Sequence, residues 1–405
     1  MRTSEKLRVL AVIGTRPEAV KMVPVLRELR SREDVELKVV STAQHRQMLD
    51  QVLNVFGIVP DIDLDIMRPN QSLNEIVQRA VAGLDSVLQN CSPDVVLVQG
   101  DTTTAFVAAL AAFYRHIEVA HIEAGLRSFD RYNPYPEEMN RRLISGVASL
   151  HFAPTDKSVG NLMREGVPAE QIYLTGNTVV DCLLGIAHAG QNRLAKYLPS
   201  GFRLNGNRMI LITAHRRENW HGPIRELCEA VAGMAIMFPK TKFLYPVHMN
   251  PKVRQVVFPI LSGIPNVALT EPLPYCEFVE AMAASYLILT DSGGVQEEAP
   301  SLGKPVLVLR ETTERPEGIS LGAAKLIGTE RHRIVSETLY LLRDHAEYGR
   351  MATMRNPYGD GRAAERTVQG LLHHFGRGPR PDKFEVVRPT VSFPRQEAAL
   401  LVKTA

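Results

Sequence analysis

The sequence predicts an α/β protein in which two Rossmann-like domains face a central cleft. Short apolar runs alternate with amphipathic helical patterns along the 405-residue chain, which is typical of a parallel sheet covered by helices on both faces. This alternation starts a second time near Arg208, so we expect two similar halves. Polar motifs follow several apolar runs, and ligands of such sheets bind beyond the carboxyl ends of the strands.

The expected elements follow the apolar and amphipathic patterns in order. The first half has predicted strands at 7–14, 35–41, 94–100 and 117–123. Amphipathic stretches at 19–31 and 72–90 predict two of the helices between these strands. The second half has predicted strands at 208–214, 241–247, 266–270, 286–290 and 304–310.

The domain boundary is predicted in the segment between the two series of strands. We expect an N-terminal domain at 1–176 and a C-terminal domain at 177–362. A last helix, predicted at 363–376, is expected to pack back on the N-terminal domain. Residues 377–405 are rich in proline and charge, which predicts an extended or disordered tail.

The composition favours a cytoplasmic enzyme and argues against several other classes of protein. The net charge is only +3, from 47 basic and 44 acidic side chains, so a nucleic-acid-binding polycation is not expected. Four dispersed cysteines without a CxxC pair indicate a reducing compartment. No apolar stretch approaches the ~18 residues of a membrane-spanning helix, and the N-terminus does not resemble a signal peptide.

A glycine pair after the predicted strand 286–290 indicates an anion-binding turn. Ser292, Gly293 and Gly294 fall where that strand ends and a helix begins, and the free N–H groups of a helix N-terminus favour an anion. Glu297 and Glu298 follow within the first turn. Glu297 is expected to complement the helix dipole, whereas Glu298 could reach the hydroxyls of a ribose.

Two further groups of cations follow predicted strands. Arg16 and Lys21 in "GTRPEAVK" lie near a predicted helix N-terminus, where cations are unfavourable unless an anionic ligand or solvent compensates. His215, Arg216 and Arg217 in "TAHRREN" follow the first strand of the second half, a place that suits phosphate. For Arg217, a structural ion pair is an equal alternative.

Acidic side chains gather at the strand ends of the first half. Asp101 in "GDTTTA" follows a predicted strand, and its alternative role is the N-cap of the next helix. Glu123 follows the next strand in "HIEAGLRS", and Glu137 and Glu138 begin a helix in "PYPEEMNR". Carboxylates placed together in a cleft acquire separated pKa values, as acid–base catalysis requires.

The motifs quoted above are part of a series that extends from about residue 7 to about residue 375. In their order along the chain, these motifs resemble those of the non-hydrolysing UDP-N-acetylglucosamine 2-epimerases. The motifs that carry the resemblance are "GTRPEAVK", "TAQHRQMLDQVL", "GDTTTA", "HIEAGLRS", "PYPEEMNR", "TGNTVVD", "TAHRREN", "TDSGGVQEEAPSLGKPVLVLR" and "TTERPE". The resemblance implies a GT-B-like fold, a homodimer and interconversion of UDP-N-acetylglucosamine and UDP-N-acetylmannosamine. The reaction proceeds through elimination of UDP to 2-acetamidoglucal and needs no cofactor and no metal.

The resemblance also implies roles for individual residues, with the acids in the N-terminal domain and UDP bound by the C-terminal domain. The implied catalytic residues are Asp101, Glu123, Glu137 and His215. The implied contacts to the nucleotide sugar are Arg16, Lys21, Ser292, Gly293, Gly294 and Arg315, with Glu298 on the ribose and Phe278 at the uracil. Leu273 stands where some relatives carry a glutamine near the base.

Some bacterial relatives bind a second, activating UDP-N-acetylglucosamine. The positions that match this allosteric site are Gln44, Gln47, Glu138, Arg216 and His248. Asn70, however, stands where those relatives often have a basic residue.

Four rival functions remain open from the sequence. One is a 2-epimerase of a modified UDP-sugar such as a 2,3-diacetamido uronic acid, for which Arg127 and Arg315 could bind the substrate carboxylate. Another is a hydrolysing epimerase that releases free N-acetylmannosamine. The others are a GT-B glycosyltransferase and a non-catalytic UDP-sugar sensor.

Overall fold

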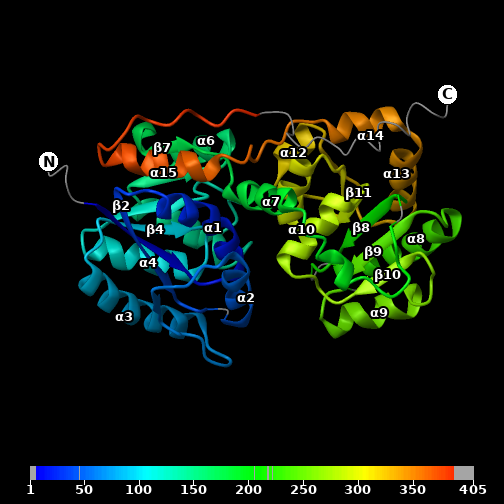
Figure 1. Ribbon diagram of the computed structural model, residues 1–405, viewed down its shortest axis with the longest axis horizontal. Helices are drawn as coiled ribbons and strands as arrows, with labels where there is room; N and C mark the ends of the chain where they lie inside the picture. The colour runs from blue at the N-terminus through cyan, green and yellow to red at the C-terminus, as the bar shows by residue number, and fades with distance from the viewer. Residues whose placement is uncertain (1–5, 45, 205, 217–218, 221, 387–405) are drawn as a thin grey trace. The chain divides into compact units, whose positions relative to one another are not determined.

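The computed structural model describes residues 6–44, 46–204, 206–216, 219–220 and 222–386, without the side chains of residues 47 and 48. Within these limits the chain forms two compact units (Figure 1). Unit 1 contains the chain up to Cys182 together with Gly361–Glu385, and unit 2 contains Leu183–Asp360. Each unit is built around its own parallel sheet, in agreement with the predicted α/β fold class.

Unit 1 has a seven-stranded sheet in the order β3-β2-β1-β4-β5-β6-β7. All its pairings are parallel, and β1 and β4 are buried except at Arg8 because helices cover both faces. The order reverses between β1 and β4, so the carboxyl ends of these strands mark the place where ligands of open α/β sheets bind. The strands are β1 (Leu7–Ile13), β2 (Val35–Ser41), β3 (Ile62–Asp63), β4 (Val95–Gln99), β5 (Glu118–Ile122), β6 (Leu150–Ala153) and β7 (Ile172–Leu174).

Side-chain caps begin several helices of unit 1. The hydroxyl of Ser72 accepts a hydrogen bond from the N–H of Glu75, whose carboxylate accepts one from the Ser72 N–H, and this capping box starts α3. The Thr102 hydroxyl caps α4 by accepting a hydrogen bond from the N–H of Ala105. The helices are α1 (Arg16–Arg30), α2 (Arg46–Phe56), α3 (Leu73–Cys91), α4 (Thr103–Tyr114), α5 (Glu137–Val147), α6 (Asp156–Arg164), α7 (Thr178–Ala189) and α15 (Ala363–His374).

The last helix of the chain, α15, is part of unit 1, and Figure 1 shows it beside β7 and α6. Its first N–H groups, of Ala363 and Ala364, donate to the carboxylate of Asp181 at 3.2 and 2.7 Å. Asp181 lies in α7, and the boundary between the units falls inside this helix, after Cys182, rather than at residue 176. No loop marks this boundary because one continuous helix crosses it.

The segment that follows α15 has no helix or strand as far as residue 386. The buried Phe384 donates its N–H to Leu174 O at 2.9 Å, and the guanidinium of Arg380 donates to Ile172 O at 2.6 Å. This part of the predicted tail therefore runs along unit 1 in a defined position. Residues 387–405 of the predicted tail lie outside the described residues.

Unit 2 has a six-stranded parallel sheet in the order β10-β9-β8-β11-β12-β13, which reverses between β8 and β11. Its strands are β8 (Met209–Thr213), β9 (Lys242–Pro246), β10 (Val267–Thr270), β11 (Leu287–Thr290), β12 (Val306–Val308) and β13 (Ala324–Leu326). Its helices are α8 (Gly222–Met237), α9 (Pro251–Leu261), α10 (Tyr275–Ala284), α11 (Gly293–Glu298), α12 (Pro316–Ser320), α13 (Arg331–Arg343) and α14 (His345–Ala352). Across the described part of both units, no helix combines the length and the apolar character that crossing a membrane requires.

Candidate active site

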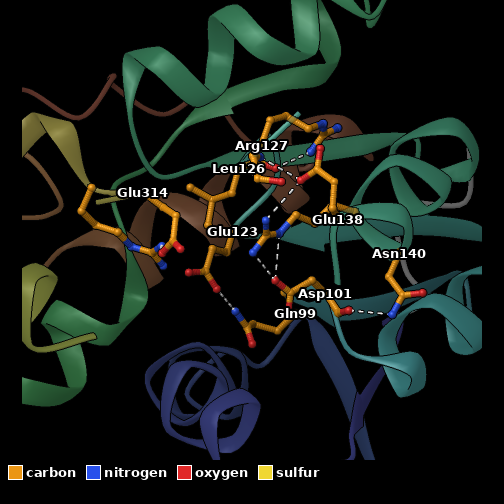
Figure 2. A network of polar contacts seen from close by, with 12 residues as sticks. Gln99, Asp101, Glu123, Leu126, Arg127, Glu138, Asn140 and Glu314 are labelled. Atoms are coloured by element: carbon orange, nitrogen blue, oxygen red, sulfur yellow. Dashed lines mark hydrogen bonds and ion pairs between the residues drawn. The ribbon is translucent and has the colours of Figure 1, made fainter. Parts of the chain in front are cut away.

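Glu123 is a buried carboxylate at the carboxyl end of β5 (Figure 2). The Nζ of Lys21, on α1, lies 2.5 and 2.6 Å from its two oxygens, and the side-chain amides of Gln99 and Asn177 donate to it as well. The backbone of Glu123 has φ = 63°, a left-handed conformation that non-glycine residues adopt rarely and often at functional sites. Lys21 therefore lies against a carboxylate, not at the open helix end that its position in the sequence predicts.

Asp101 follows β4, the strand next to β5, and its side chain is 27% exposed. Arg141 of α5 holds its Oδ2 with two guanidinium nitrogens, Nε at 2.8 Å and Nη2 at 2.7 Å (Figure 2). Asn140 fixes the backbone by donating to Asp101 O at 2.8 Å. The N-cap role that we kept as an alternative for Asp101 is wrong, because the Thr102 hydroxyl accepts the hydrogen bond from the N–H of Ala105.

The two glutamates that begin α5 differ in their surroundings. The carboxylate of Glu138 is fully buried and accepts hydrogen bonds from the N–H groups of Ser128 and Phe129, at 2.9 and 3.2 Å. These bonds secure the loop before α5. Glu137 is half-buried, and its Oε2 is buried without a hydrogen-bond partner among the described residues. Of this pair, Glu137 is the one with acceptor capacity left for a ligand.

Glu18 is a buried acid whose importance the sequence analysis missed. It lies in the first turn of α1, is 1% exposed, and accepts hydrogen bonds from Gly14 N at 3.1 Å and Thr102 Oγ1 at 2.6 Å. It thus joins the loop after β1 to the loop after β4, next to Asp101. Burial raises the pKa of Glu18 to about 7 against the lowering effect of these hydrogen bonds.

The raised pKa of Glu18 predicts that Glu18→Gln stabilises the protein at alkaline pH. Between pH 4.5 and 7 the folded state holds a proton that the unfolded state releases, so stability falls as the pH rises through this range. Above pH 7 the ionised carboxylate costs about 3 kcal/mol. We expect Glu18→Gln to raise the free energy of unfolding at pH 8 by about 2 kcal/mol and to change it little at pH 5, as measured by urea denaturation.

Glu75→Gln is the matched control for this prediction. Glu75 is an exposed carboxylate whose capping hydrogen bonds to Ser72 lower its pKa. Neutralising it should decrease the free energy of unfolding at pH 8, which is the opposite sign. A Glu18→Gln variant that loses stability equally at both pH values would contradict the raised pKa.

The predicted anion-binding turn forms in unit 2. Ser292 is the N-cap residue of α11 and uses no side-chain hydrogen bond in doing so. A Cβ on Gly293 would lie 3.5 Å from Cζ of Arg315, so the guanidinium lies close over this backbone. Arg315 is in turn held by Glu297, with Nε 2.6 Å from Oε1. Glu297 is the fifth residue of the six-residue α11 and not part of its first turn, so the predicted dipole role is wrong, and the carboxylate pairs with Arg315 instead.

The predicted contacts to a nucleoside lie near this turn in unit 2. Glu298 is 7% exposed and accepts a hydrogen bond of 2.7 Å from the hydroxyl of Tyr275. Phe278 is half-buried on α10, one turn after Tyr275. Tyr275 therefore orients the Glu298 carboxylate.

The loop after β8 is fastened to the residue that precedes the glycine turn. Asp291 Oδ2 accepts hydrogen bonds of 2.9 Å from the N–H groups of His215 and Arg216. Arg216 also donates from Nε to Asp291 O at 3.1 Å. The His215 ring stacks on that of His248, with centroids 6.1 Å apart and planes inclined by 21°. Arg217 lies outside the described residues.

The remaining predicted residues have varied surroundings. Arg16 of unit 1 is exposed at the start of α1. Both alternatives given for it, an anionic ligand and solvent, require this exposure. Gln44 accepts a hydrogen bond of 2.8 Å from the Thr104 hydroxyl, and the side chain of Gln47 lies outside the described part of the chain. The predicted allosteric residues are divided between the units, and activation by a second ligand stays a prediction.

Unit 1 thus brings Asp101, Glu123 and Lys21 to neighbouring strand ends, and unit 2 brings His215, Arg216 and the 292–294 turn together. The sequence analysis missed the residues that hold these groups, which are Glu18, Gln99, Arg141, Asn177 and Asp291. A signal was present for Asp291, which lies between a strand and a glycine turn. Within the described ranges, no group of His, Cys, Asp or Glu is arranged to hold a metal ion.

Comparisons with known proteins agree with the predicted resemblance. A family model described as UDP-N-acetylglucosamine 2-epimerase matches residues 27–372. The UDP-N-acetylglucosamine 2-epimerases of Salmonella typhimurium and Escherichia coli K12 are 51% and 50% identical over 372 residues, which cover 90% and 91% of this chain and 98% and 99% of those proteins.

A solved structure supports the same assignment. The UDP-GlcNAc 2-epimerase from Neisseria meningitidis, bound to UDP-GlcNAc, is 48% identical with a TM-score of 0.83, and the match covers 91% of this chain and 100% of that one. The two-sheet α/β fold class and the family that the motifs predict are therefore confirmed. The chain belongs to the UDP-N-acetylglucosamine 2-epimerase family of isomerases.

Proposed function

We propose that the protein interconverts UDP-N-acetylglucosamine and UDP-N-acetylmannosamine by eliminating UDP to 2-acetamidoglucal, returning a proton to C2 from the opposite face and adding UDP back at C1. The observation that carries this proposal is the pair of carboxylates Asp101 and Glu123 at the ends of adjacent strands, each held by a cation. The relative from Neisseria meningitidis, which is bound to UDP-GlcNAc, supports the choice of substrate.

An elimination mechanism avoids the direct removal of the C2 proton, which is difficult in this substrate. The proton on C2 is not next to a carbonyl carbon, so its direct removal is strongly unfavourable. Breaking the bond between C1 and the oxygen of UDP gives C1 oxocarbenium character, which acidifies the C2 proton. Loss of that proton gives the glucal and UDP, and re-addition of a proton from the opposite face and of UDP at C1 gives the epimer.

Unit 1 supplies the acid–base groups in this proposal. Proton exchange at C2 on both faces needs two groups, and Asp101, Glu123 and Glu137 are the candidates. Lys21 orients Glu123 and Arg141 orients Asp101 through these ion pairs. Glu137 has a buried oxygen without a partner in the described part of the chain, so it can bind or exchange a proton without breaking an existing hydrogen bond.

Unit 2 supplies the groups that stabilise the departing diphosphate. Negative charge grows on UDP as the C1–O bond breaks, and preorganised donors are most effective against such developing charge. The backbone at Ser292–Gly294, the Arg315 guanidinium over it and His215 are donors of this kind. Arg16 of unit 1 adds an exposed cation, and Glu298 and Phe278 are the proposed contacts to ribose and uracil.

The surroundings of Arg127 argue against a uronic acid substrate. Its side chain is completely buried, and its Nε and Nη2 donate to Glu165 at 2.8 and 2.6 Å. Nη2 also donates to the Ser145 hydroxyl. This guanidinium is already neutralised within unit 1, so it does not offer a free site for a substrate carboxylate.

We further propose that the protein acts as a homodimer in the cytoplasm. Three large apolar side chains on α4 and α5, Phe113, Tyr114 and Leu143, are 51%, 69% and 44% exposed, as a subunit interface would explain. None of the four cysteines, which all lie among the described residues, is in a disulfide, as a reducing compartment would favour. Light scattering at micromolar concentration would give twice the mass of 45.0 kDa.

Proton NMR of UDP-N-acetylglucosamine with the enzyme in D₂O tests the reaction. We expect signals of UDP-N-acetylmannosamine to grow in, with deuterium at C2 of both epimers, because the C2 proton exchanges with solvent in the glucal step. Release of free N-acetylmannosamine in step with UDP would instead identify a hydrolysing enzyme. Unchanged C1 and C2 signals at high enzyme concentration would refute the epimerase and favour a sensor or a transferase.

A further inference from the structure

Asp291 is a fully buried acid at the end of β11, directly before the glycine turn. Burying a carboxylate without partners destabilises the folded state, so each hydrogen bond to Asp291 matters for its charge. Burial acts to raise its pKa, but the hydrogen bond and charge of His215, with donors from Arg216 and Asn219, lower the pKa overall. Asp291 is thus held as an anion inside unit 2.

The two oxygens of Asp291 have different partners. Oδ2 accepts three hydrogen bonds of 2.9 Å, from the N–H groups of His215 and Arg216 and from the side-chain amide of Asn219. Oδ1 is buried and accepts no hydrogen bond from the described residues, and Nδ1 of His215 lies 3.2 Å from it. Oδ2 therefore holds the loop, whereas Oδ1 is directed at the imidazole.

Two further contacts hold His215 in place, one to its backbone and one to its ring. Trp220 donates from Nε1 to His215 O at 3.0 Å, which anchors the backbone of His215. The His248 ring stacks on the imidazole, and burial followed by the charge of His215 lowers the pKa of His248. A neutral His248 does not compete with His215 for the Asp291 carboxylate.

We propose that Asp291 is a positioning residue that keeps a proton on Nδ1 of His215 and stabilises the imidazolium, so that Nε2–H donates to the departing diphosphate from a charged ring. The inference rests on the proposed function, in which His215 faces that diphosphate. A carboxylate behind a histidine fixes both its tautomer and its charge. The 44% exposure of the His215 side chain leaves the ring accessible to a ligand.

Asp291→Asn tests this arrangement because it keeps the size of the side chain while changing its hydrogen bonding. The new amide can still accept N–H groups of the loop through its oxygen, and its NH₂ group then donates to Nδ1. We expect the ring to become neutral with its proton on Nε2. The measurement is two-dimensional ¹H–¹⁵N NMR of the ring nitrogens at fixed pH, with the His215 signals assigned by their loss in His215→Gln.

The kinetic result should separate positioning from folding. We expect kcat of Asp291→Asn to fall roughly 100-fold with KM changed less than about threefold, since a charge that acts mainly in the transition state is lost. Asn219→Ala is the matched control, because it removes one donor to Oδ2 and leaves the contact between Oδ1 and His215. It should lower the melting temperature while the ring nitrogens of His215 keep the shifts of the wild type.

Two results would overturn the role of Asp291. One is a set of His215 ring shifts in Asp291→Asn equal to those of the wild type, and the other is an unchanged kcat. The NMR measurement needs no turnover, so it decides the contact even if the wild-type protein epimerises nothing. A wild type that epimerises while Asp291→Asn leaves the ring unaltered would remove the positioning role and leave the proposed function standing.

Discussion

Asp101→Asn is expected to lower kcat/KM for epimerisation by a factor of at least about 150, or ~3 kcal/mol of transition-state stabilisation. The substitution keeps the shape of the side chain and removes its charge and basicity. Arg141 then faces a neutral amide in place of Oδ2, while Asn140 still holds the backbone. Initial rates of UDP-N-acetylmannosamine formation, measured over a range of substrate concentrations, give the ratio.

Asp94→Asn, at the opposite end of β4, is the matched control. Asp94 precedes β4, whereas Asp101 follows it, and Asp94 also pairs with an arginine, Arg8, at 2.8 Å. The chemical change is the same, but it takes place at the end of the strand that is remote from the proposed chemistry. We expect kcat/KM to stay within about threefold of the wild type. Near wild-type turnover in Asp101→Asn, or equal losses in both variants, would remove Asp101 from the mechanism.

Two buried histidines of unit 1 are expected to contribute about 4 kcal/mol of destabilisation on acidification from pH 7 to pH 5, of which the protonation of Glu18 offsets about 2 kcal/mol. His121 and His151 lie side by side on β5 and β6 and are fully buried. Burial lowers the pKa of His121 to about 3 and that of His151 to about 4, from an ordinary value of 6.5. Urea denaturation at the two pH values measures the change.

The direction follows from which state binds the protons. Below pH 6.5 the unfolded imidazoles become protonated while the folded ones stay neutral, so unfolding takes up protons and stability is lost as the pH falls. At pH 5 each group lies about 1.5 pH units below its unfolded pKa, which corresponds to about 2 kcal/mol. The contribution is present in full above pH 6.5, and its loss continues down to the folded pKa values.

His151→Leu separates this effect from other acid-sensitive groups. The variant should lose about 2 kcal/mol less than the wild type between pH 7 and pH 5, whatever its stability at pH 7. His332→Gln, which removes a histidine whose side chain is 77% exposed, is the matched control for the loss of an imidazole. His151 is the better choice for the test because His121 bonds Gly100 O at 2.7 Å, next to Asp101. An identical pH dependence in His151→Leu and the wild type would show that the buried ring is not the cause.

Local patterns in the sequence were sufficient to predict the longer strands and the acids at their ends. The predicted strands at 7–14 and 117–123 correspond to β1 and β5, because a buried parallel strand is a continuous apolar run. The strands β3, β6, β7 and β13, of two to four residues, escaped prediction. So short a run does not differ from the apolar face of a helix. The equally short β10, β11 and β12 were predicted because they lie within longer apolar runs at 266–270, 286–290 and 304–310.

The sequence by itself determined the fold class, the family and the side chains that carry the proposed chemistry, because apolar periodicity, glycine turns and motif order are properties of neighbouring residues. Only the tertiary structure decided which side chains pair with one another. Lys21 meets Glu123 and Glu18 meets Thr102 across separations of 102 and 84 residues, and α15 returns to unit 1 through Asp181. Such partners depend on strand order and register, since a carboxylate is neutralised by whichever donor the packed sheet brings within reach, irrespective of its place in the chain.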